Sequence, residues 1–109
     1  MESHFLQQSA GDGVLALPAG LVARFLRYAE RMEIYGPNLG MPYTRLMREG
    51  LFELRLQASE EIARVFYCTL VDWRIVMLHQ FVKKTAKTPR IELDIARRRM
   101  QEVKDGAHT

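Results

Sequence analysis

The first sustained pattern along the chain is helical. From Leu17-Pro18 onward, apolar side chains recur at spacings of four and three and form one stripe: Leu21, Phe25, Tyr28, Met32 and Tyr35. Gly36-Pro37 ends the pattern, because glycine suits a left-handed cap and proline cannot continue a helix. The pattern predicts a helix that is buried along one face. Residues 1–13 show no sustained periodicity and are predicted to be irregular.

Beyond the irregular connection 38–42, the hydrophobic period changes to two. Residues 52–57 alternate between apolar and polar side chains, which is typical of a strand buried on one face. Residues 62–70 are rich in β-forming side chains and predict a second strand. Residues 75–82 are apolar on both faces and predict a central strand. Short turns separate the three strands, so the simplest arrangement is an antiparallel meander.

A second helix closes the chain. Thr88 is a suitable N-cap, and Pro89 suits the first helical position, where its missing N–H does no harm. Asp94 can pair with Arg97 or Arg98 at helical spacing. The predicted buried stripe is Leu93, Ala96, Met100 and Val103. The order of helix, three strands and helix predicts a single α+β domain spanning all 109 residues, with its helices packed on a small antiparallel sheet.

Composition narrows the class of protein. No apolar run approaches the roughly 18 residues that a membrane span needs. The N-terminus lacks the basic flank and the long apolar stretch of a signal peptide. Cys68 is the one cysteine, so no internal disulfide can form, and its place in an apolar run favours a core residue. These observations favour a cytoplasmic protein with no membrane partner.

The net charge of +3 is unevenly distributed. Residues 1–44 hold three arginines against four acids, whereas residues 45–109 hold thirteen lysines and arginines against nine acids, so the two parts carry −1 and +4. The densest basic patch consists of Lys83, Lys84, Lys87 and Arg90. Such a patch is either a binding surface for a polyanion, where neutralised phosphates release counterions, or a solvated loop before a helix.

The sequence holds no motif for a bound metal or nucleotide. The three histidines and Cys68 have no metal-ligand spacing. No glycine-rich phosphate loop follows a predicted strand, and there is no nucleophile elbow. We therefore expect no metal and no small-molecule cofactor, so that any chemistry must come from cationic side chains.

Cationic side chains stand inside the predicted strands. Arg55 lies on the polar face of its strand, and Arg64 interrupts an apolar strand, where an unpaired charge would be costly. Arg64 therefore either pairs with Glu53 or Glu61 or belongs to a binding site. His79 is either a hydrogen-bonded structural residue or a titratable group of that site. In a meander the two arginines and the histidine can lie on neighbouring strands. They would then supply the base, acid and cations that metal-free RNA cleavage needs.

Four segments of the sequence resemble one family of toxins: Tyr35 to Gly40, Gly50 to Arg55, Arg64 to Tyr67 and Leu78 to Pro89. Across residues 14–104 the chain resembles the HigB-type branch of the RelE/ParE toxin superfamily, which is related to phage-derived host-killing proteins. The most specific piece is the Phe-Val-Lys-Lys-Thr-x-Lys-Thr-Pro run. The resemblance implies a RelE-like fold with an antiparallel sheet of three to four strands, an N-terminal helix or helices and a C-terminal helix.

The resemblance also implies an activity and partners. The chain would be the toxin of a type II toxin–antitoxin system, an mRNA interferase that enters the ribosomal A site and cuts the translated mRNA by metal-independent 2′-OH attack. Its partners would be the ribosome with its mRNA and a HigA-like helix-turn-helix antitoxin. Arg64 matches the phosphate-stabilising arginine of the superfamily. The predicted catalytic residues are Arg64, His79, Lys84 and Arg55. The predicted RNA-binding residues are Lys83, Lys87, Arg90, Arg45 and Arg48.

The chain departs from the family pattern in two places. Relatives often carry a tyrosine near the C-terminus, but residues 93–109 contain none, so the acid or base must come from elsewhere. Relatives commonly open with a β-strand, for which His4-Phe5-Leu6 is the one candidate.

Two other functions stay open at this point. One is a ParE-like inhibitor of DNA gyrase, which needs no nuclease chemistry. The other is a catalytically inactive module that binds RNA or a protein partner. Clustered cations beside a titratable group favour the nuclease.

Overall fold

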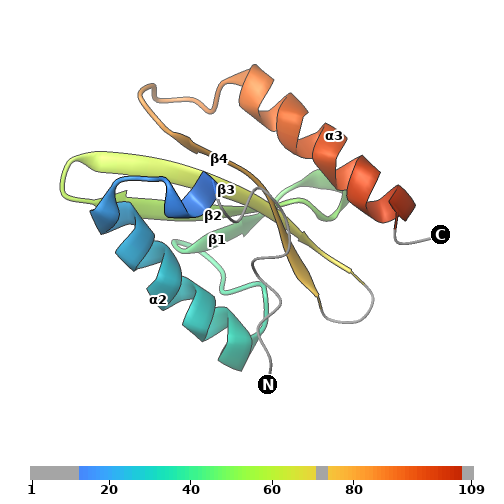
Figure 1. Ribbon diagram of the computed structural model, residues 1–109, viewed down its shortest axis with the longest axis horizontal. Coiled ribbons are helices and arrows are strands. Elements are labelled where there is room, and N and C mark those ends of the chain that lie inside the picture. The colour runs from blue at the N-terminus through green and yellow to red at the C-terminus, as the bar shows by residue number, and fades with distance from the viewer. Residues whose placement is uncertain (1–12, 71–73, 107–109) are drawn as a thin grey trace.

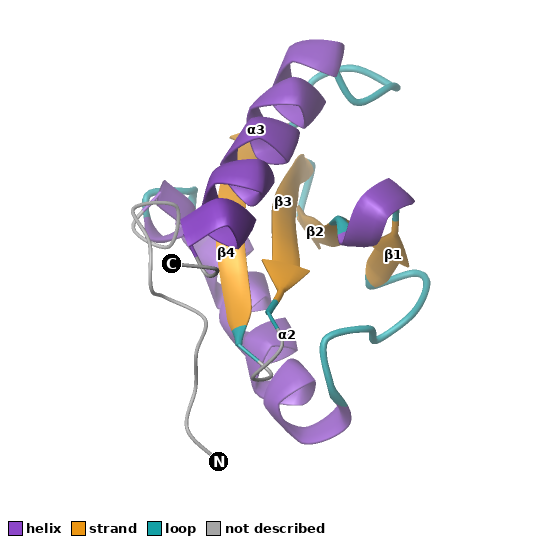
Figure 2. Ribbon diagram, turned by 90° about the vertical axis from the view of Figure 1, so that its right-hand side faces the viewer, coloured by secondary structure: helices purple, strands orange, loops and turns teal. Residues whose placement is uncertain are grey.

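The computed structural model describes residues 13–70 and 74–106. They form three layers, with a four-stranded antiparallel sheet between two helices. The helices are α2 (Ala19–Tyr35) and α3 (Arg90–Gly106), which lie on opposite sides of the sheet (Figure 1). The strands lie side by side in the order β1 (Thr44–Leu46), β2 (Phe52–Ala58), β3 (Glu61–Thr69) and β4 (Ile75–Val82) (Figure 2). The α+β class predicted from the sequence is confirmed, and the arrangement is that of a RelE-like fold.

Strand alternation divides the sheet into two apolar faces. The face toward α2 packs against the buried stripe of that helix, and the sheet residues of this core are Phe52, Leu54, Leu56, Ala63, Val65, Tyr67, Ile75 and Met77. The other face packs against α3, and its core residues on the strands are Phe66, Cys68, Val76, Leu78 and Phe81. Cys68 is thus a buried core residue, as the sequence predicts. In the described part of the chain, no helix is long and apolar enough to cross a membrane.

Helix α2 forms where the apolar stripe predicts it. Its inward side chains are buried or half-buried: Leu21, Phe25, Tyr28 and Met32. The helix ends at Gly36, whose φ of 96° is accessible to glycine and whose N–H donates to the Met32 carbonyl. Tyr35 was also predicted to be buried, but it is 75% exposed. The last turn of α2 extends past the strands of the sheet (Figure 1).

Strand β4 differs from the prediction of a central strand. Within the described residues it pairs with β3 alone, which places it at one side of the sheet. Both faces of β4 carry apolar side chains because a helix covers each of them. Ile75 and Met77 belong to the core beside α2, and Val76 and Leu78 belong to the core beside α3. Burial on both faces therefore comes from two helices and not from two neighbouring strands.

The short strand β1 supplies the fourth strand. It pairs with β2, with Thr44 opposite Leu54, and a short 3₁₀ turn, η1 (Arg48–Gly50), connects the two. Thr44 is 1% exposed, and its hydroxyl accepts a hydrogen bond from the Gly40 N–H. This local network orders a segment in which hydrophobic periodicity gives no signal. The N-terminal candidate strand, His4-Phe5-Leu6, lies outside the described residues.

Helix α3 begins at Arg90, one residue later than predicted. The Pro89 carbonyl accepts a hydrogen bond from the Glu92 N–H, so proline immediately precedes the first helical residue. The Thr88 hydroxyl was predicted to cap this helix, but it reaches back to Glu53 on β2. The predicted stripe is confirmed, with buried or half-buried Leu93, Ala96, Met100 and Val103.

Candidate functional site

Three cationic side chains and one carboxylate gather on the α3 side of the sheet. Arg55 of β2 lies directly opposite Arg64 of β3 in the ladder. Glu53 lies two residues before Arg55, so both side chains point to the same face. Lys83 joins them from the chain just beyond β4, where its N–H donates to the carbonyl of Ile62, two residues before Arg64. We call these four residues the cationic cluster.

The cluster lies beside helix α3 and not beneath it. The helix packs on β4 and β3, whereas β2 packs mainly on β3, β1 and α2. The side chains that β2 presents toward this face are Glu53, Arg55 and Gln57. Glu53 and Arg64 are nearly buried, with 4% and 7% of their side-chain surface exposed, whereas the value for Arg55 is 31%. A ligand would therefore approach past Arg55, with Arg64 and Glu53 forming the floor.

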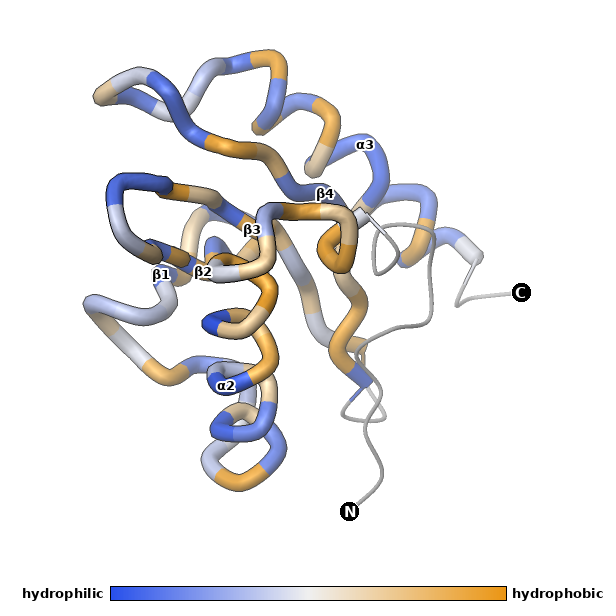
Figure 3. The backbone as a smooth tube through the Cα atoms, turned by 60° about the vertical axis from the view of Figure 1, so that its left-hand side comes forward, coloured by the Kyte–Doolittle hydropathy of each residue, from blue (hydrophilic) through white to orange (hydrophobic). Residues whose placement is uncertain are grey.

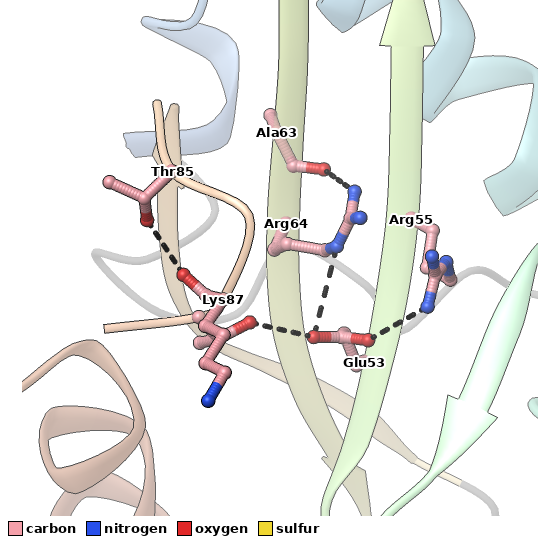
Figure 4. A network of polar contacts seen from close by, with 7 residues as sticks. Glu53, Arg55, Ala63, Arg64, Thr85 and Lys87 are labelled. Atoms are coloured by element: carbon pink, nitrogen blue, oxygen red, sulfur yellow. Dashed lines mark hydrogen bonds and ion pairs between the residues drawn. The ribbon is translucent and has the colours of Figure 1, made fainter. Parts of the chain in front are cut away.

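Glu53 connects the two arginines of the cluster (Figure 4). Its Oε1 lies 3.6 Å from Arg55 Nη1, and its Oε2 lies 3.8 Å from Arg64 Nε. The Thr88 hydroxyl donates to the same Oε2 at 3.5 Å. Of the two acids that the sequence offers as partners of Arg64, the structure shows Glu53. All three distances exceed those of short charge-assisted hydrogen bonds, which are about 2.7–2.9 Å.

Arg64 is a buried guanidinium with incomplete hydrogen bonding. Its Nη1 donates to the Ala63 carbonyl at 3.1 Å (Figure 4). Its Nε is buried and has no hydrogen-bond partner within the described residues. Burial lowers the pKa of Arg64, Arg55 lowers it further, and Glu53 raises it. An arginine remains protonated despite such shifts, so the site holds a positive charge with one unused donor.

A β-bulge brings Lys83 to the cluster. Phe66 of β3 pairs with His79, but the next residue, Tyr67, pairs with Met77, so one extra residue is inserted in β4. Without it, strict alternation from Met77 would turn His79 and Lys83 toward the α2 face. With it, they share the face of Arg64. The Lys83 N–H donates to the Ile62 carbonyl at 2.7 Å, which extends the β3–β4 ladder past Val82.

The environment of Lys83 disfavours its charged form. Burial lowers the pKa of Lys83 most, Arg64 lowers it next, Glu53 raises it and Arg55 lowers it. Lys84, which the sequence analysis places among the catalytic residues, is exposed. The structure therefore brings Lys83 to the cluster, whereas Lys84 lies on the surface of the adjoining loop.

The connection between β4 and α3, residues 83–89, is the basic loop. It is hydrophilic along much of its length (Figure 3), and the Thr85 hydroxyl donates to the Lys87 carbonyl at 2.7 Å within it (Figure 4). Lys84 and Lys87 are exposed. Arg90 follows at the start of α3, 92% exposed and 3.9 Å from Asp94. Lys87 and Arg90, two of the predicted RNA contacts, are therefore accessible on one continuous segment, whereas Lys83, a third, is half-buried in the cluster.

The other two predicted RNA contacts lie elsewhere. Arg45 is exposed on β1, directly opposite Glu53 in the ladder, so it adjoins the cluster. Arg48 is exposed in η1, whose Glu49 carbonyl accepts a hydrogen bond from Lys104 near the end of α3. Arg48 is therefore placed at the opposite end of α3 from the basic loop.

His79 joins β4 to helix α3. Its Nε2 lies 2.9 Å from Glu92 Oε1, and its Nδ1 lies 3.5 Å from Arg99 Nη1. Arginine can only donate, so Nδ1 is the acceptor, and Nε2 carries the proton donated to Glu92. Arg99 also donates to the Leu78 carbonyl at 2.9 Å. Both ring nitrogens thus make polar contacts, as expected if His79 is a hydrogen-bonded structural residue.

Aromatic side chains separate His79 from the cluster. Phe66 lies between His79 and Glu53 across the sheet, and Phe81 lies between His79 and Lys83 along β4. The rings of Phe66 and Phe81 stack with centroids 6.0 Å apart. The structure therefore brings Arg55, Arg64 and Lys83 together and places His79 in a neighbouring network.

The sequence analysis missed one member of the site. Glu53 entered only as a possible ion-pair partner, although it contacts both arginines and the basic loop. The available signal was its position on the polar face of a strand, two residues from Arg55. For metals, the described residues contain no group of three or more His, Cys, Asp or Glu that could hold an ion.

The fold and the cluster define a class, a small α+β domain with a RelE-like sheet and a cationic patch beside its C-terminal helix. Residues 12–101 match the family described as Phage derived protein Gp49-like. This match covers more than half of the chain, so the chain belongs to that family, which falls broadly among the RelE/HigB-like toxins. No match was found among the curated proteins. Family membership is compatible with a toxin of the toxin–antitoxin type.

Proposed function

We propose that this protein is a ribosome-dependent endoribonuclease of the HigB type, which cleaves translated mRNA as the toxin of a type II toxin–antitoxin system. The observation that carries the proposal is the cationic cluster, in which Arg55, Arg64 and Lys83 converge around one carboxylate on a face that α3 leaves open. Family membership supports the toxin role. Ribosome dependence and the HigB branch rest on the resemblance in sequence.

The proposed chemistry needs only the side chains of the cluster. Lys83, as a neutral amine, takes the proton from the RNA 2′-OH, and the 2′-oxygen attacks the adjacent phosphorus. Arg64 and Arg55 neutralise the charge that develops on the phosphoryl oxygens. The P–O bond to the 5′-oxygen breaks, and the Lys83 ammonium returns the proton to that oxygen. The products are a 2′,3′-cyclic phosphate and a 5′-hydroxyl end.

The lowered pKa of Lys83 supports its role in this scheme. A general base works best when its pKa lies near the working pH, and free lysine lies far above it. Burial and the two guanidinium groups lower the pKa of Lys83, which raises its neutral fraction. The exposed lysines of the basic loop and Arg90 would contact flanking phosphates.

The test is to express the protein and map new mRNA 5′ ends in cells, with Arg64→Ala as the inactive variant. Arg27→Ala, which removes an exposed arginine of α2, is the matched control. Cuts within translated codons, lost in Arg64→Ala and kept in Arg27→Ala, support the proposal. Loss of DNA supercoiling without cuts would point to gyrase inhibition instead. Binding of RNA without either effect would point to an inactive module.

We also propose a helix-turn-helix antitoxin as the inhibitor. The outer face of α2 is polar and exposed at Arg27, Glu30 and Arg31, and the Arg31 guanidinium lies over the Tyr43 ring at 5.5 Å. An antitoxin bound to this face would exclude the toxin from the ribosome by its bulk. Hydrogen exchange on the complex tests the idea. Unchanged exchange in both α2 and the cationic cluster would contradict it.

A further inference from the structure

Glu53 is held more loosely than its burial suggests. Its side chain is 4% exposed, yet its contacts with Arg55, Arg64 and Thr88 are 3.6, 3.8 and 3.5 Å long. Charge-assisted hydrogen bonds are about 2.7–2.9 Å long. The carboxylate therefore supplies negative charge to the cluster without a close bond to either guanidinium.

Arg64 shows the complementary feature. Its Nε is buried and, in the part of the chain that the structure describes, makes no hydrogen bond. A buried donor without an acceptor costs free energy, so this N–H gains from any ligand oxygen that comes within hydrogen-bonding distance. Arg55 is more exposed than Glu53 and Arg64. An anion that enters past Arg55 would meet Arg64 next.

A phosphate and Glu53 would then compete for the same guanidinium groups. Like charges a few ångströms apart repel strongly in a partly buried site. Glu53 has a further partner in the basic loop, because the Thr88 hydroxyl donates to its Oε2. Moving toward Thr88 would relieve the repulsion without leaving the carboxylate unpaired.

We propose that Glu53 is the resident counter-ion of the cationic cluster, that a phosphate of the RNA replaces it on Arg64, and that the displaced carboxylate stays with Thr88. Glu53 is then a positioning residue that couples occupation of the site to the basic loop. The proposal rests on the proposed function for the identity of the anion, RNA, but not for the exchange itself.

The first experiment follows the exchange in the full-length protein without ribosomes. Inorganic phosphate is the probe, and chloride keeps the ionic strength constant. NMR reports the ¹³C signal of the Glu53 carboxyl group and the ¹H–¹⁵N signal of Arg64 Nε. We expect both signals to move with the same apparent Kd. A moving Arg64 signal with an unchanged Glu53 carboxyl signal would overturn the proposal.

The second experiment compares Glu53→Gln with Glu60→Gln, which removes the same charge at the exposed turn between β2 and β3. Glu53→Gln should bind phosphate at least about tenfold more tightly than Glu60→Gln, because only the first removes the competing charge at the site. Phosphate should also raise the Tm of Glu53→Gln more, a readout that survives partial unfolding of the variant. Equal affinities and equal Tm shifts in the two variants would overturn the proposal.

A cleavage assay separates this inference from the proposed function. Loss of kcat in Glu53→Gln with unchanged phosphate affinity would assign Glu53 as a general base and overturn the exchange. If phosphate exchange is observed but the wild-type protein never cuts mRNA on ribosomes, the exchange stands and the proposed nuclease function fails.

Discussion

The ion pair between Arg64 and Glu53 gives the sharpest test of what the cluster is for. At 3.8 Å, two unit charges attract by about 4 kcal/mol at an effective dielectric constant of about 20. Both side chains are nearly buried, and removing each ion from water costs several kcal/mol, so the net contribution to stability should be close to zero. Such a pair therefore adds little to the stability of the fold.

Single and double substitutions should therefore diverge. Glu53→Gln leaves Arg64 buried beside Arg55 and should cost about 3–5 kcal/mol of unfolding free energy. Arg64→Met should cost less, about 2–3 kcal/mol, because Glu53 keeps Arg55 and Thr88 as partners. The double variant Glu53→Gln/Arg64→Met should lie within about 1 kcal/mol of the parent. Its cleavage rate should stay reduced by about 10²–10³-fold, because the phosphate-stabilising guanidinium is gone.

Urea unfolding of the four proteins at constant m value supplies the stabilities. Single-turnover cleavage of ribosome-bound message supplies the rates. The reasoning is refuted if the double variant loses the sum of the two single losses, since the charges would then not interact. It is also refuted if the double variant cuts at the parental rate.

Four further outcomes follow from the site. Lys83→Ala should lower kcat by about 10²-fold or more, whereas Lys84→Ala should mainly reduce the salt dependence of ribosome binding by about one unit of slope; the reverse pattern would return the catalytic role to Lys84. The cleavage rate should rise with pH as Lys83 loses its proton, and Arg55→Gln should move this rise to higher pH, because Arg55 lowers the Lys83 pKa; a shift to lower pH would exclude Lys83 as the base. His79→Gln should lower the unfolding free energy by about 1–2 kcal/mol and leave that pH dependence in place, and a large loss of kcat would restore a catalytic role for His79. A chelator, under conditions that keep ribosomes intact, should leave cleavage unchanged, and a loss of activity would reveal a metal.

The sequence predicts the elements well where one face is apolar. The stripe of α2 and the alternation of β2 each follow from burial on one side, and both are present in the structure. The same alternation places Arg55 and Arg64 on one face once the β2–β3 hairpin sets their register. The prediction for β4 failed because a strand covered by two helices carries the same apolar pattern as a central strand.

The placement of Lys83 could not be predicted from the sequence. A period of two carried from Met77 assigns Lys83 to the α2 face, away from Arg64. The bulge between Met77 and His79 reverses that assignment, and nothing in the run of apolar residues marks it. The choice between Lys83 and Lys84 as the catalytic lysine therefore depends on one inserted residue. The hydrogen bond from Thr88 to Glu53 could not be predicted from the sequence either, because the two residues are 35 positions apart.

Helix α3 determines which part of its sheet face becomes core and which becomes site. Beneath the helix, Phe66, Leu78 and Phe81 form an apolar core. Beyond it, the same face carries Arg55 and Arg64, which tolerate partial burial because Glu53 compensates them. The basic loop connects the end of β4 to the start of α3. It therefore lies next to the part of the sheet face that α3 does not cover. The position of α3 thus determines where the apolar core, the cationic cluster and the basic loop lie relative to one another.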